Sequence, residues 1–274
     1  MKNIVVTIPI YKEQPNEYEL VSFKQCLDIL NRYRISLVVP EGLDFSLYDK
    51  YLINNRIDYS IERFSSSYFE NINGYNRLML SVEFYSRFID FDYLLIYQLD
   101  CFVFADELEK WSNYGYDYIG APWIYVKKNK HYFHGVGNGG LSLRNPKALK
   151  LYLESKSVKM NVQGFWRLYD KYSFIKKIFR ISKIFLTIFG YENSNKYYLK
   201  RIGFNEDYVF GFVSQFSQFK LNIPSEQIAL KFAFDSYPNF LFEQNGNKLP
   251  FGCHAWYKYG DENLTFWKKY ILKK

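Results

Sequence analysis

The feature that most constrains the fold is an apolar run over residues 94–104, LLIYQLDCFVF, in which Asp100 is the one carboxylate. A run this rich in aliphatic and aromatic residues is typical of a strand buried on both faces of an α/β sheet. A buried carboxylate is unfavourable unless it is paired or holds a metal. Because ligands of open α/β sheets bind beyond the carboxyl ends of the strands, the run predicts a ligand site at Asp100.

The elements before this run alternate between strand and helix. Strands are expected at 3–8, 35–39 and 57–64, and helices at 17–33, 46–53 and 75–88, with a polar loop over 65–74. This alternation predicts parallel strands with helical crossovers, as in the Rossmann-like half of a nucleotide-binding fold. No G-x-G-x-x-G motif follows the first strand and no P-loop motif occurs, which argues against a dinucleotide dehydrogenase and a P-loop NTPase.

The elements after the run are less regular. We expect helices at 105–114, 146–154, 174–189 and 205–218, strands at 116–120, 141–144 and 229–234, and a polar, basic loop over 127–134. The helix at 174–189 is predicted to be basic and amphipathic. Because no internal repeat or linker is evident, the simplest division is a single domain over 1–274 with a helical insertion at about 156–200.

Composition narrows the class of protein. Hydrophobic residues make up 48% of the 274 positions, which is enough for a large core and argues against disorder. The net charge of +8 suits anionic partners, but no zinc-finger spacing or RNP-like motif supports a nucleic-acid partner. Three cysteines without metal spacing fit a reducing cytoplasm. We find no signal peptide and no uncharged window of transmembrane length, so we expect a cytoplasmic protein.

Four short motifs follow one another along the chain. They are Gln98-Leu99-Asp100, Gly137-Asn138-Gly139-Gly140, Asn205-Glu206-Asp207 and Cys253-His254-Ala255-Trp256. In this order they resemble the motifs of GT-A glycosyltransferases: an Asp-x-Asp metal motif, a glycine-rich acceptor-side loop, a Glu-Asp pair and a late metal-binding His. Over most of its length the chain also resembles a family of uncharacterised bacterial proteins associated with surface-polysaccharide genes, in part through residues 117–123.

The resemblance implies both a fold and an activity. The fold would be a GT-A-like α/β domain, with a Rossmann-like mixed sheet flanked by helices. The activity would be transfer of a sugar from a nucleotide-diphosphate sugar to a hydroxyl of a glycan or lipid-linked glycan, with inversion, in surface polysaccharide synthesis. A retaining transferase of the same fold and a non-catalytic glycan-binding protein are the alternatives, and a nucleotidyltransferase is a weaker one.

The resemblance also implies a divalent cation, Mn²⁺ or Mg²⁺, held by Asp100 and His254. Such a metal would neutralise charge that develops on the leaving diphosphate. Gln98 departs from the family pattern, which has an acidic residue at that position. Two alternatives follow: the metal is held by Asp100, His254 and the diphosphate, or the enzyme needs no metal and uses basic residues. A strand-end Asp bonded to backbone and a structural His would explain the same residues without a metal.

Further site residues are implied by the same resemblance. The donor-binding set is Thr7, Pro9, Tyr11, Asn76, Arg77, Gln98 and Asp100, and the acceptor- or sugar-lining set is Trp123, His134, Gly137, Asn138, Gly139 and Gly140. Glycines at such a loop would let a ligand approach the backbone closely. An ordinary strand-to-helix loop, a plain hairpin turn and a surface salt bridge of Arg77 are the competing explanations for these residues.

Asp207 is the candidate general base, with Glu206 orienting the site or contacting acceptor hydroxyls. Inverting transfer needs one carboxylate to take the proton of the attacking hydroxyl. The alternative is that both carboxylates stabilise a helix N-terminus. The segments 174–189 and 267–274 are candidates for peripheral contact with an anionic membrane, although core packing with snorkelling lysines explains 174–189 equally well.

Overall fold

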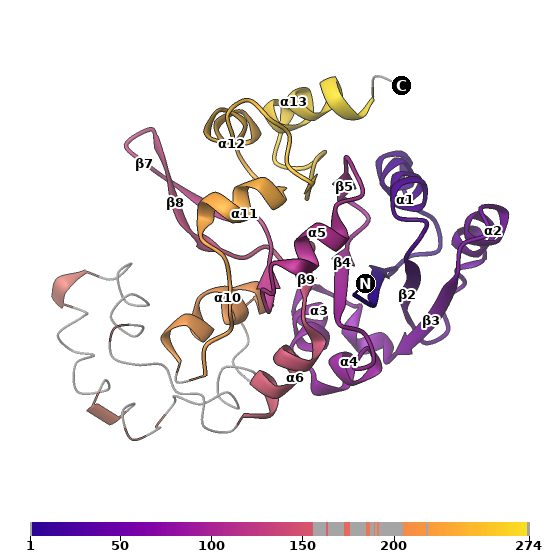
Figure 1. Ribbon diagram of the computed structural model, residues 1–274, viewed down its shortest axis with the longest axis horizontal. Coiled ribbons are helices and arrows are strands. Elements are labelled where there is room, and N and C mark those ends of the chain that lie inside the picture. Colours follow the sequence, from indigo (N-terminus) through magenta and orange to yellow (C-terminus); the bar gives the residue numbers. More distant parts are fainter. Residues whose placement is uncertain are drawn as a thin grey trace.

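The computed structural model describes residues 2–155, 205–217 and 219–272, together with isolated positions between 163 and 191. In this part of the chain a central six-stranded mixed sheet is flanked by helices on both faces (Figure 1). The strand order is β3-β2-β1-β4-β9-β6. These strands span Ile4–Pro9 (β1), Arg34–Pro40 (β2), Tyr59–Phe64 (β3), Tyr93–Tyr97 (β4), Tyr118–Ile119 (β6) and Leu141–Arg144 (β9). The α/β class and the mixed sheet are confirmed.

The first four strands are parallel, as the alternation of elements predicts. β9 then runs antiparallel to β4, with Leu143 opposite Leu95, and β6 runs antiparallel to β9. This reversal makes the sheet mixed. It also brings the start of β9 to the same edge as the carboxyl ends of β1 and β4, so residues 137–140 arrive beside Gln98 and Asp100.

Two layers of helices cover the sheet. One face carries α1 (Glu17–Ile29), α2 (Ser46–Asn54) and α5 (Leu108–Asn113), and the other carries α3 (Ile72–Met79), α4 (Val82–Arg87), α6 (Pro146–Glu154) and α10 (Glu206–Gly211). Strand side chains alternate between the layers: Leu95 packs with the first group and Ile96 with the second. Short 3₁₀ turns lie at Ser66–Tyr68 (η1) and Val213–Phe216 (η2).

A smaller part of the molecule lies beyond the carboxyl edge of the sheet. It contains a three-stranded sheet of β5 (Phe102–Val103), β11 (Gly252–Cys253) and β10 (Ala233–Phe234). A hairpin of β7 (Pro122–Lys127) and β8 (Lys130–Val136) and the helices α11 (Glu226–Phe232), α12 (Pro238–Gln244) and α13 (Asp261–Ile271) complete it. None of the helices in the described ranges is long and apolar enough to cross a membrane.

The run over residues 94–104 is not one strand. β4 ends at Tyr97, and the chain turns through Gln98 to Cys101, where the Cys101 N–H donates to the Gln98 carbonyl at 2.9 Å. Strand pairing resumes at Phe102, but in the three-stranded sheet. Asp100 therefore lies in the turn between two sheets rather than inside a strand.

Other expectations are also corrected. The segment 127–134 is not a loop, because it forms most of the β7–β8 hairpin, and 229–234 is helical through Phe232. The single helix expected over 75–88 divides into α3 and α4, because the Ser81 side chain caps a new helix by accepting from the Phe84 N–H at 3.1 Å. The helix expected at 205–218 ends at Gly211.

Of the two segments expected to contact a membrane, only the C-terminal one lies largely within the described residues. The amphipathic helix at 174–189 and the insertion at 156–200 lie outside the described residues, apart from isolated positions. The C-terminal segment begins inside α13, where the Trp267 ring is fully buried and stacks on Phe104 with centroids 5.7 Å apart. Trp267 is thus part of the core and is not available to a membrane.

Candidate functional site

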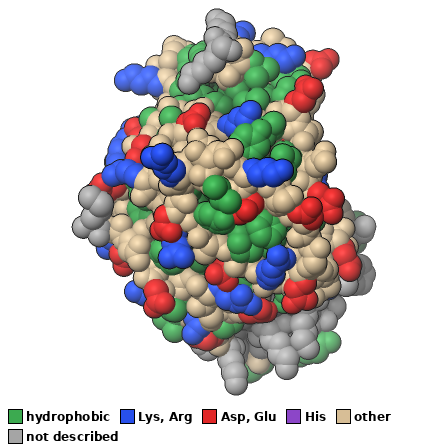
Figure 2. All heavy atoms as spheres, turned by 90° about the vertical axis from the view of Figure 1, so that its right-hand side faces the viewer, with side chains coloured by type: hydrophobic (Ala, Val, Ile, Leu, Met, Phe, Trp, Pro, Cys, Tyr) green, Lys and Arg blue, Asp and Glu red, His purple; other side chains and the backbone are tan. Residues whose placement is uncertain are grey.

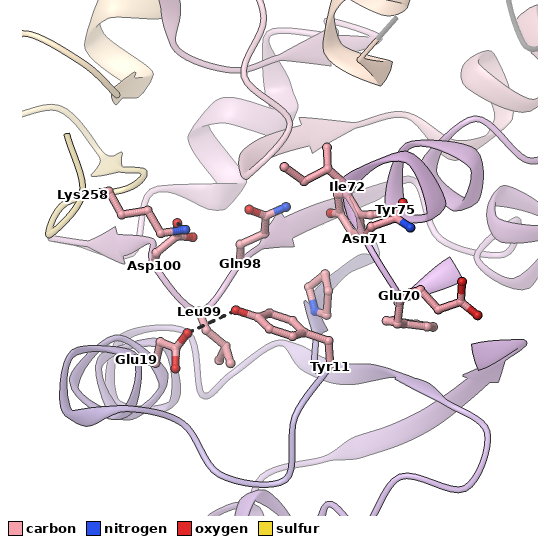
Figure 3. A pocket seen from close by; sticks show the side chains of 12 residues that line it. Tyr11, Glu19, Glu70, Asn71, Ile72, Tyr75, Gln98, Leu99, Asp100 and Lys258 are labelled. Carbon is pink, nitrogen blue, oxygen red and sulfur yellow. Dashed lines mark hydrogen bonds and ion pairs between the residues drawn. The ribbon is translucent and has the colours of Figure 1, made fainter. Parts of the chain in front are cut away.

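A cavity of about 350 Å³ opens at the carboxyl ends of β1 and β4. Figure 3 shows Tyr11 and Glu19 on one side of it, Ile72 and Tyr75 on the other, and Gln98 between them. The lining residues are Pro9, Tyr11, Glu19, Phe69, Glu70, Asn71, Ile72, Tyr75, Gln98, Leu99, Asp100 and Lys258. Rings and aliphatic groups with a few polar groups are the usual lining of a small-molecule site.

The wall on the β1 side is held by the start of α1. Asn16 and Glu19 form a reciprocal capping box, which places the Glu19 carboxylate at the helix N-terminus. Glu19 is 3% exposed, accepts from the Tyr11 hydroxyl at 3.3 Å and lies 2.5 Å from the Lys12 ammonium. Burial and the charge of Glu19 raise the pKa of Tyr11 to about 12, so the phenol stays a hydrogen-bond donor.

The opposite wall is formed by residues 69–71, which follow η1, and by the first turn of α3. The Asn71 side chain caps α3 by accepting from the Gly74 N–H at 3.0 Å, which leaves its amide NH₂ for other partners. Gly74 is needed here, because a Cβ would lie 2.6 Å from the Ser67 carbonyl oxygen. This close packing sets the position of Ile72, whose side chain is 74% exposed at the cavity.

Asp100 lies at the inner end of the cavity and is 4% exposed. Its Oδ1 is 3.4 Å from His254 Nε2, and its Oδ2 is 2.6 Å from the Lys258 ammonium. Burial alone would raise the pKa of Asp100, but the charges of His254 and Lys258 hold it well below its usual value. The Lys258 contact is an ion pair without aligned hydrogen-bond geometry, so Oδ2 keeps capacity for another partner.

His254 is oriented by a carboxylate that the sequence analysis missed. Asp235 Oδ1 lies 2.9 Å from Nδ1, while Nε2 faces Gln98 Oε1 at 3.2 Å. The Asn138 amide nitrogen also lies 3.1 Å from Nδ1, but Nδ1 cannot both donate to Asp235 and accept from Asn138. Because the contact with Asp235 is shorter and involves a charged group, Nδ1 donates to Asp235. Burial lowers the pKa of His254, but Asp100 and Asp235 outweigh it and raise this pKa to about 10.

The donor atoms at this point fit a hard divalent cation. Gln98 Oε1, Asp100 Oδ1 and His254 Nε2 supply oxygen and nitrogen ligands, with Nε2 3.2 and 3.4 Å from the two oxygens. Ligands of an octahedral ion with bonds of about 2.1 Å lie about 3 Å apart. A carboxylate on the second ring nitrogen, as Asp235 provides, is the usual support of a metal-binding His. Cys101 lies in the same group, but burial raises its thiol pKa and it donates to the Gly140 carbonyl.

Asn138 connects the cluster of Gln98, Asp100 and His254 to the carboxylates of Glu206 and Asp207. Its backbone N–H donates to Asp207 Oδ2 at 3.0 Å, and its side-chain oxygen accepts from the Gly140 N–H at 3.1 Å. The backbone of Asn138 is left-handed, with φ of 64°, which an Asn tolerates better than most residues. Asn138 thus lies between Asp207 and His254 in space.

The glycines at 139 and 140 make room for these side chains. A Cβ on Gly139 would lie 1.6 Å from Glu206 Oε1, and a Cβ on Gly140 would lie 2.2 Å from His254 Nε2. Contact between backbone and functional side chains therefore explains the two glycines without a ligand.

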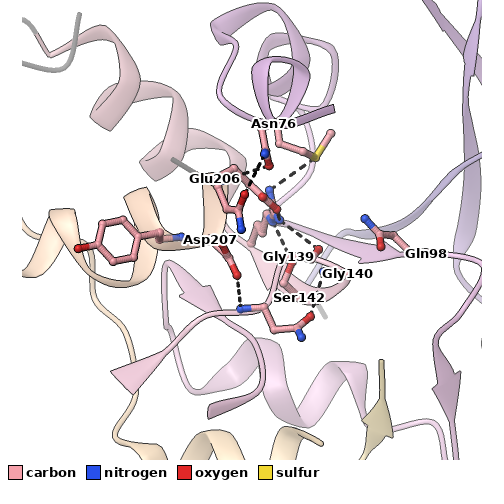
Figure 4. Close-up of polar contacts among 12 residues, drawn as sticks. Asn76, Gln98, Gly139, Gly140, Ser142, Glu206 and Asp207 are labelled. Atoms are coloured by element: carbon pink, nitrogen blue, oxygen red, sulfur yellow. Dashed lines mark hydrogen bonds and ion pairs between the residues drawn. The ribbon is translucent and has the colours of Figure 1, made fainter. Parts of the chain in front are cut away.

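Glu206 is held by a fully buried arginine, Arg144. Figure 4 shows the polar contacts around Glu206, Gly139 and Ser142. Arg144 Nη2 donates to Glu206 Oε1 at 3.0 Å and to the Gly139 carbonyl at 3.2 Å. Its other nitrogens donate to the Ser142 hydroxyl at 2.9 Å and the Tyr85 hydroxyl at 2.9 Å. Glu206 is 4% exposed, so this ion pair fixes the first turn of α10 against β9.

Asp207 points the other way from Glu206 and is partly exposed. Its two oxygens accept from the backbone N–H groups of Asn138, at 3.0 Å, and Tyr208, at 2.7 Å. Burial and the neighbouring charge of Glu206 raise its pKa to about 6, against the opposing effect of these hydrogen bonds. A carboxylate with such a pKa is ionised at neutral pH and more basic than an ordinary one.

The structure brings together only some of the residues expected in the site. Pro9, Tyr11, Gln98 and Asp100 line the cavity, and Asn138, Gly139, Gly140, Glu206, Asp207 and His254 form the adjoining polar cluster. Thr7 is fully buried within the sheet and donates to the Leu95 carbonyl at 2.9 Å. Asn76 is also buried, and its amide oxygen accepts from the Glu206 N–H at 3.3 Å.

The remaining expected residues lie further from the cavity and the polar cluster. Arg77 donates to the Ser67 carbonyl at 3.3 Å and faces a second, open hollow lined also by Arg63 and Arg87. Trp123 packs over Gly137, where a Cβ would lie 1.8 Å from the indole ring. His134 is exposed on the β7–β8 hairpin. Asp235 and Lys258 were missed because each is a lone charged residue outside any motif, and Glu19 because its capping-box position indicates a helix start and no ligand.

Replacing Arg144 with Met tests the buried ion pair. The change leaves the Glu206 charge without a partner, so we expect the free energy of unfolding to fall by about 3–5 kcal/mol, measured by urea denaturation. Arg87→Met is the matched control, because its ion pairs with Glu62 and Glu83 are at the surface and are worth at most about 1 kcal/mol. Equal losses in the two variants would contradict a special role for Arg144.

Comparison with known proteins gives a family and distant structural likenesses. Core-mannan synthase A from Aspergillus fumigatus, in a Mn/GDP form, aligns over 56% of this chain and 63% of its own, with 9% identity and a TM-score of 0.41. TarS 1-349 from S. aureus aligns over 56% and 49%, with 11% identity and a TM-score of 0.35. A glycosyltransferase involved in glycosylation of the PBCV-1 major capsid aligns over 97% and 98%, with 9% identity and a TM-score of 0.43.

The chain spans less than two thirds of the first two of these structures. No curated protein matches the sequence. The family model described as "Protein of unknown function (DUF5672)" matches residues 58–254, which include β3, β4, the glycine loop, α10 and His254. This match covers well over half of the sequence, and the chain therefore belongs to the DUF5672 family.

Proposed function

We propose that this protein is a glycosyltransferase that moves a sugar from a nucleotide-diphosphate sugar to a hydroxyl of a glycan acceptor. The observation that carries the proposal is the placement of Asn138 between Asp207 and His254. A basic carboxylate then lies next to side chains that would bind a cation, at the end of a cavity of about 350 Å³. Sugar transfer needs this combination: a base for the acceptor, and positive charge for the leaving diphosphate.

The donor would occupy the cavity between α1 and α3. Tyr11 and Ile72 offer faces on either side for a base, and the free amide NH₂ of Asn71 offers a donor to it. The diphosphate would lie toward Asp100 and Lys258, because the Lys258 ammonium is 52% exposed and lines the cavity at that end. The pocket thus offers ring and aliphatic faces for a base together with a positive charge for phosphates, as a nucleotide requires.

A divalent cation, Mn²⁺ or Mg²⁺, fits the residues Asp100 and His254, with Gln98 as a neutral oxygen ligand. When bound, it would neutralise charge on the diphosphate. Lys258 already supplies one positive charge at the same carboxylate, so the protein brings part of this stabilisation itself. A cation at His254 Nε2 would replace the proton that the raised pKa keeps there.

Asp207 would act as the general base. It would take the proton of the acceptor hydroxyl as that oxygen bonds to the anomeric carbon, while the bond from that carbon to the diphosphate oxygen breaks. The diphosphate leaves with the electron pair of the broken bond. Attack from the side opposite the leaving group inverts the anomeric centre, and a retaining course would give the other anomer. Glu206 holds the start of α10 through Arg144 and so positions Asp207.

The finer features of this proposal come from the sequence resemblance. They are an acceptor that is a growing or lipid-linked glycan, and a place in surface polysaccharide synthesis. The membrane contact expected there is not carried by the C-terminal segment, since Trp267 is buried.

A nucleotide-sugar screen tests the donor cavity. We expect at least one nucleotide sugar, with or without Mn²⁺, to raise the melting temperature of the protein. At a ligand concentration of 100 times Kd, binding adds about 2.7 kcal/mol to the free energy of unfolding. Tyr11→Ala should weaken this binding about tenfold or more. Tyr114→Ala is the matched control, because both tyrosines are 52% exposed and Tyr114 lies outside the cavity. Equal effects of the two changes would place the donor elsewhere.

Replacing Asp207 with Asn tests the base. The amide keeps the shape but cannot take a proton, so we expect the rate of transfer to fall by 10²–10⁴-fold, while donor binding in the thermal-shift assay is unchanged. Asp28→Asn, at an exposed position of α1, should leave both unaffected. Full turnover by the Asp207 variant would show that another group is the base.

The pH profile gives an independent test of the same residue. The pKa of Asp207 is raised to about 6, so the basic form predominates above that pH and is lost below it. We expect the logarithm of kcat/KM to be level at neutral pH and to fall with a slope of one below about pH 6. A rate that is unchanged between pH 7 and pH 5 would contradict the role of Asp207.

A further inference from the structure

The tip of the β7–β8 hairpin carries positive charge that the described part of the chain does not neutralise. Three of its four residues are lysines, Lys127, Lys128 and Lys130, and residues 122–136 contain no Asp or Glu. Lys127 and Lys130 lie directly opposite each other in the strand register, an arrangement that is unfavourable for like charges. None of the three forms an ion pair with any described residue.

The hairpin presents this tip in a fixed geometry. Lys128 and Asn129 have φ of 49° and 59°, the left-handed pair that closes a tight two-residue turn. Figure 1 shows the hairpin projecting away from the central sheet, beside α12. The carboxylate that does contact the hairpin, Glu226, accepts from the Gly135 N–H at the opposite end, at 3.1 Å.

Apolar side chains are exposed on both faces immediately behind the tip. Tyr125 and Tyr132 are a cross-strand pair, stacked with centroids 5.2 Å apart, and are 43% and 41% exposed. Val126, on the other face, is 45% exposed, while its cross-strand partner His131 stacks on Phe240 of α12 with centroids 4.9 Å apart. Nearer the base, Ile124 and Phe133 pack against the core. The exposed apolar surface is therefore confined to the end of the hairpin.

This pattern fits one kind of partner best. A sugar platform needs exposed aromatic faces but no cationic tip, whereas here the exposed rings of Tyr125 and Tyr132 and the side chain of Val126 lie directly behind three lysines. At an anionic bilayer, lysines can reach the phosphates while tyrosine rings lie among the headgroups. Basic residues near such a surface are attracted to it, and apolar groups beside them add to binding. We propose that the β7–β8 tip docks the protein onto an anionic lipid bilayer.

The surface elsewhere supports this assignment. On the side of the molecule that carries α2 and β3, positive and negative side chains are interspersed (Figure 2). The hairpin tip instead collects lysines without acidic neighbours in sequence. The inference does not rest on the proposed enzyme activity, because binding to lipid needs no turnover. If the proposed activity holds as well, β8 leads directly into Gly137 and Asn138, so the docked hairpin would bring the acceptor side of the site toward lipid-carried substrates.

Vesicle flotation with the full chain tests the proposal. We expect binding to vesicles of mixed phosphatidylcholine and phosphatidylglycerol, none to phosphatidylcholine alone, and weakening by added salt. Lys127→Gln, Lys128→Gln and Lys130→Gln together should reduce binding about 100-fold, since each lysine near the surface is worth about fivefold. Tyr125→Ser with Tyr132→Ser should reduce binding without any change of charge.

The matched control is Lys50→Gln, Lys147→Gln and Lys248→Gln, which removes the same charge from exposed positions elsewhere. It should retain most of the binding. Thermal melting of each variant confirms that the fold is kept. Absence of binding by the wild-type protein, equal losses in the two triple variants, or binding to heparin but not to vesicles would each overturn the proposal, the last in favour of an acidic glycan partner.

Discussion

The buried ion pair between Arg144 and Glu206 is the interaction on which the rest of the site depends. Taking both charges out of water is unfavourable unless every donor and acceptor finds a partner. Arg144 meets this condition with partners from five segments: β9, the glycine loop, α3, α4 and α10. The pair thus acts as a joint between parts of the chain that are 62 residues apart in sequence. The position of Asp207 follows from it, because Asp207 is the next residue along α10.

The sequence predicted the core of this arrangement well. Runs of apolar residues at 3–8 and 35–39 predict buried strands, and the alternation of strands and helices predicts the parallel β1–β4 set. The strand at 57–64 is also predicted, although most β3 side chains are only partly buried, and the run at 94–104 is divided after Tyr97. Gln98, Asp100 and Pro9 were correctly placed at the carboxyl edge, because that edge follows from strand direction alone. In the same way, the helix start at Asn205 was found from its cap-like sequence.

The incorrect and absent predictions have physical causes. The turn of the β7–β8 hairpin has no glycine, although both its central residues are left-handed, so the usual hairpin signal is absent. The segment 229–234 has strand-like residues, but their apolar side chains fit a short helix beside β8. Glu19, Asp235 and Lys258 act through contacts that only the tertiary fold creates. Thr7 and Arg77 were assigned from the resemblance, by their places at a strand end and near a helix start, which do not determine where a side chain points.

The contact between Asp235 and His254 is set by strand register. Phe234 and Cys253 are partners in the parallel pair β10–β11. Asp235 directly follows Phe234 along the chain, and His254 directly follows Cys253. The His254 N–H donates to the Phe234 carbonyl at 2.9 Å, which continues that ladder by one step. The segment between the two strands, including α12, therefore does not determine how the two side chains meet. Insertions or deletions there could alter the outer surface of the protein over evolutionary time without moving the imidazole.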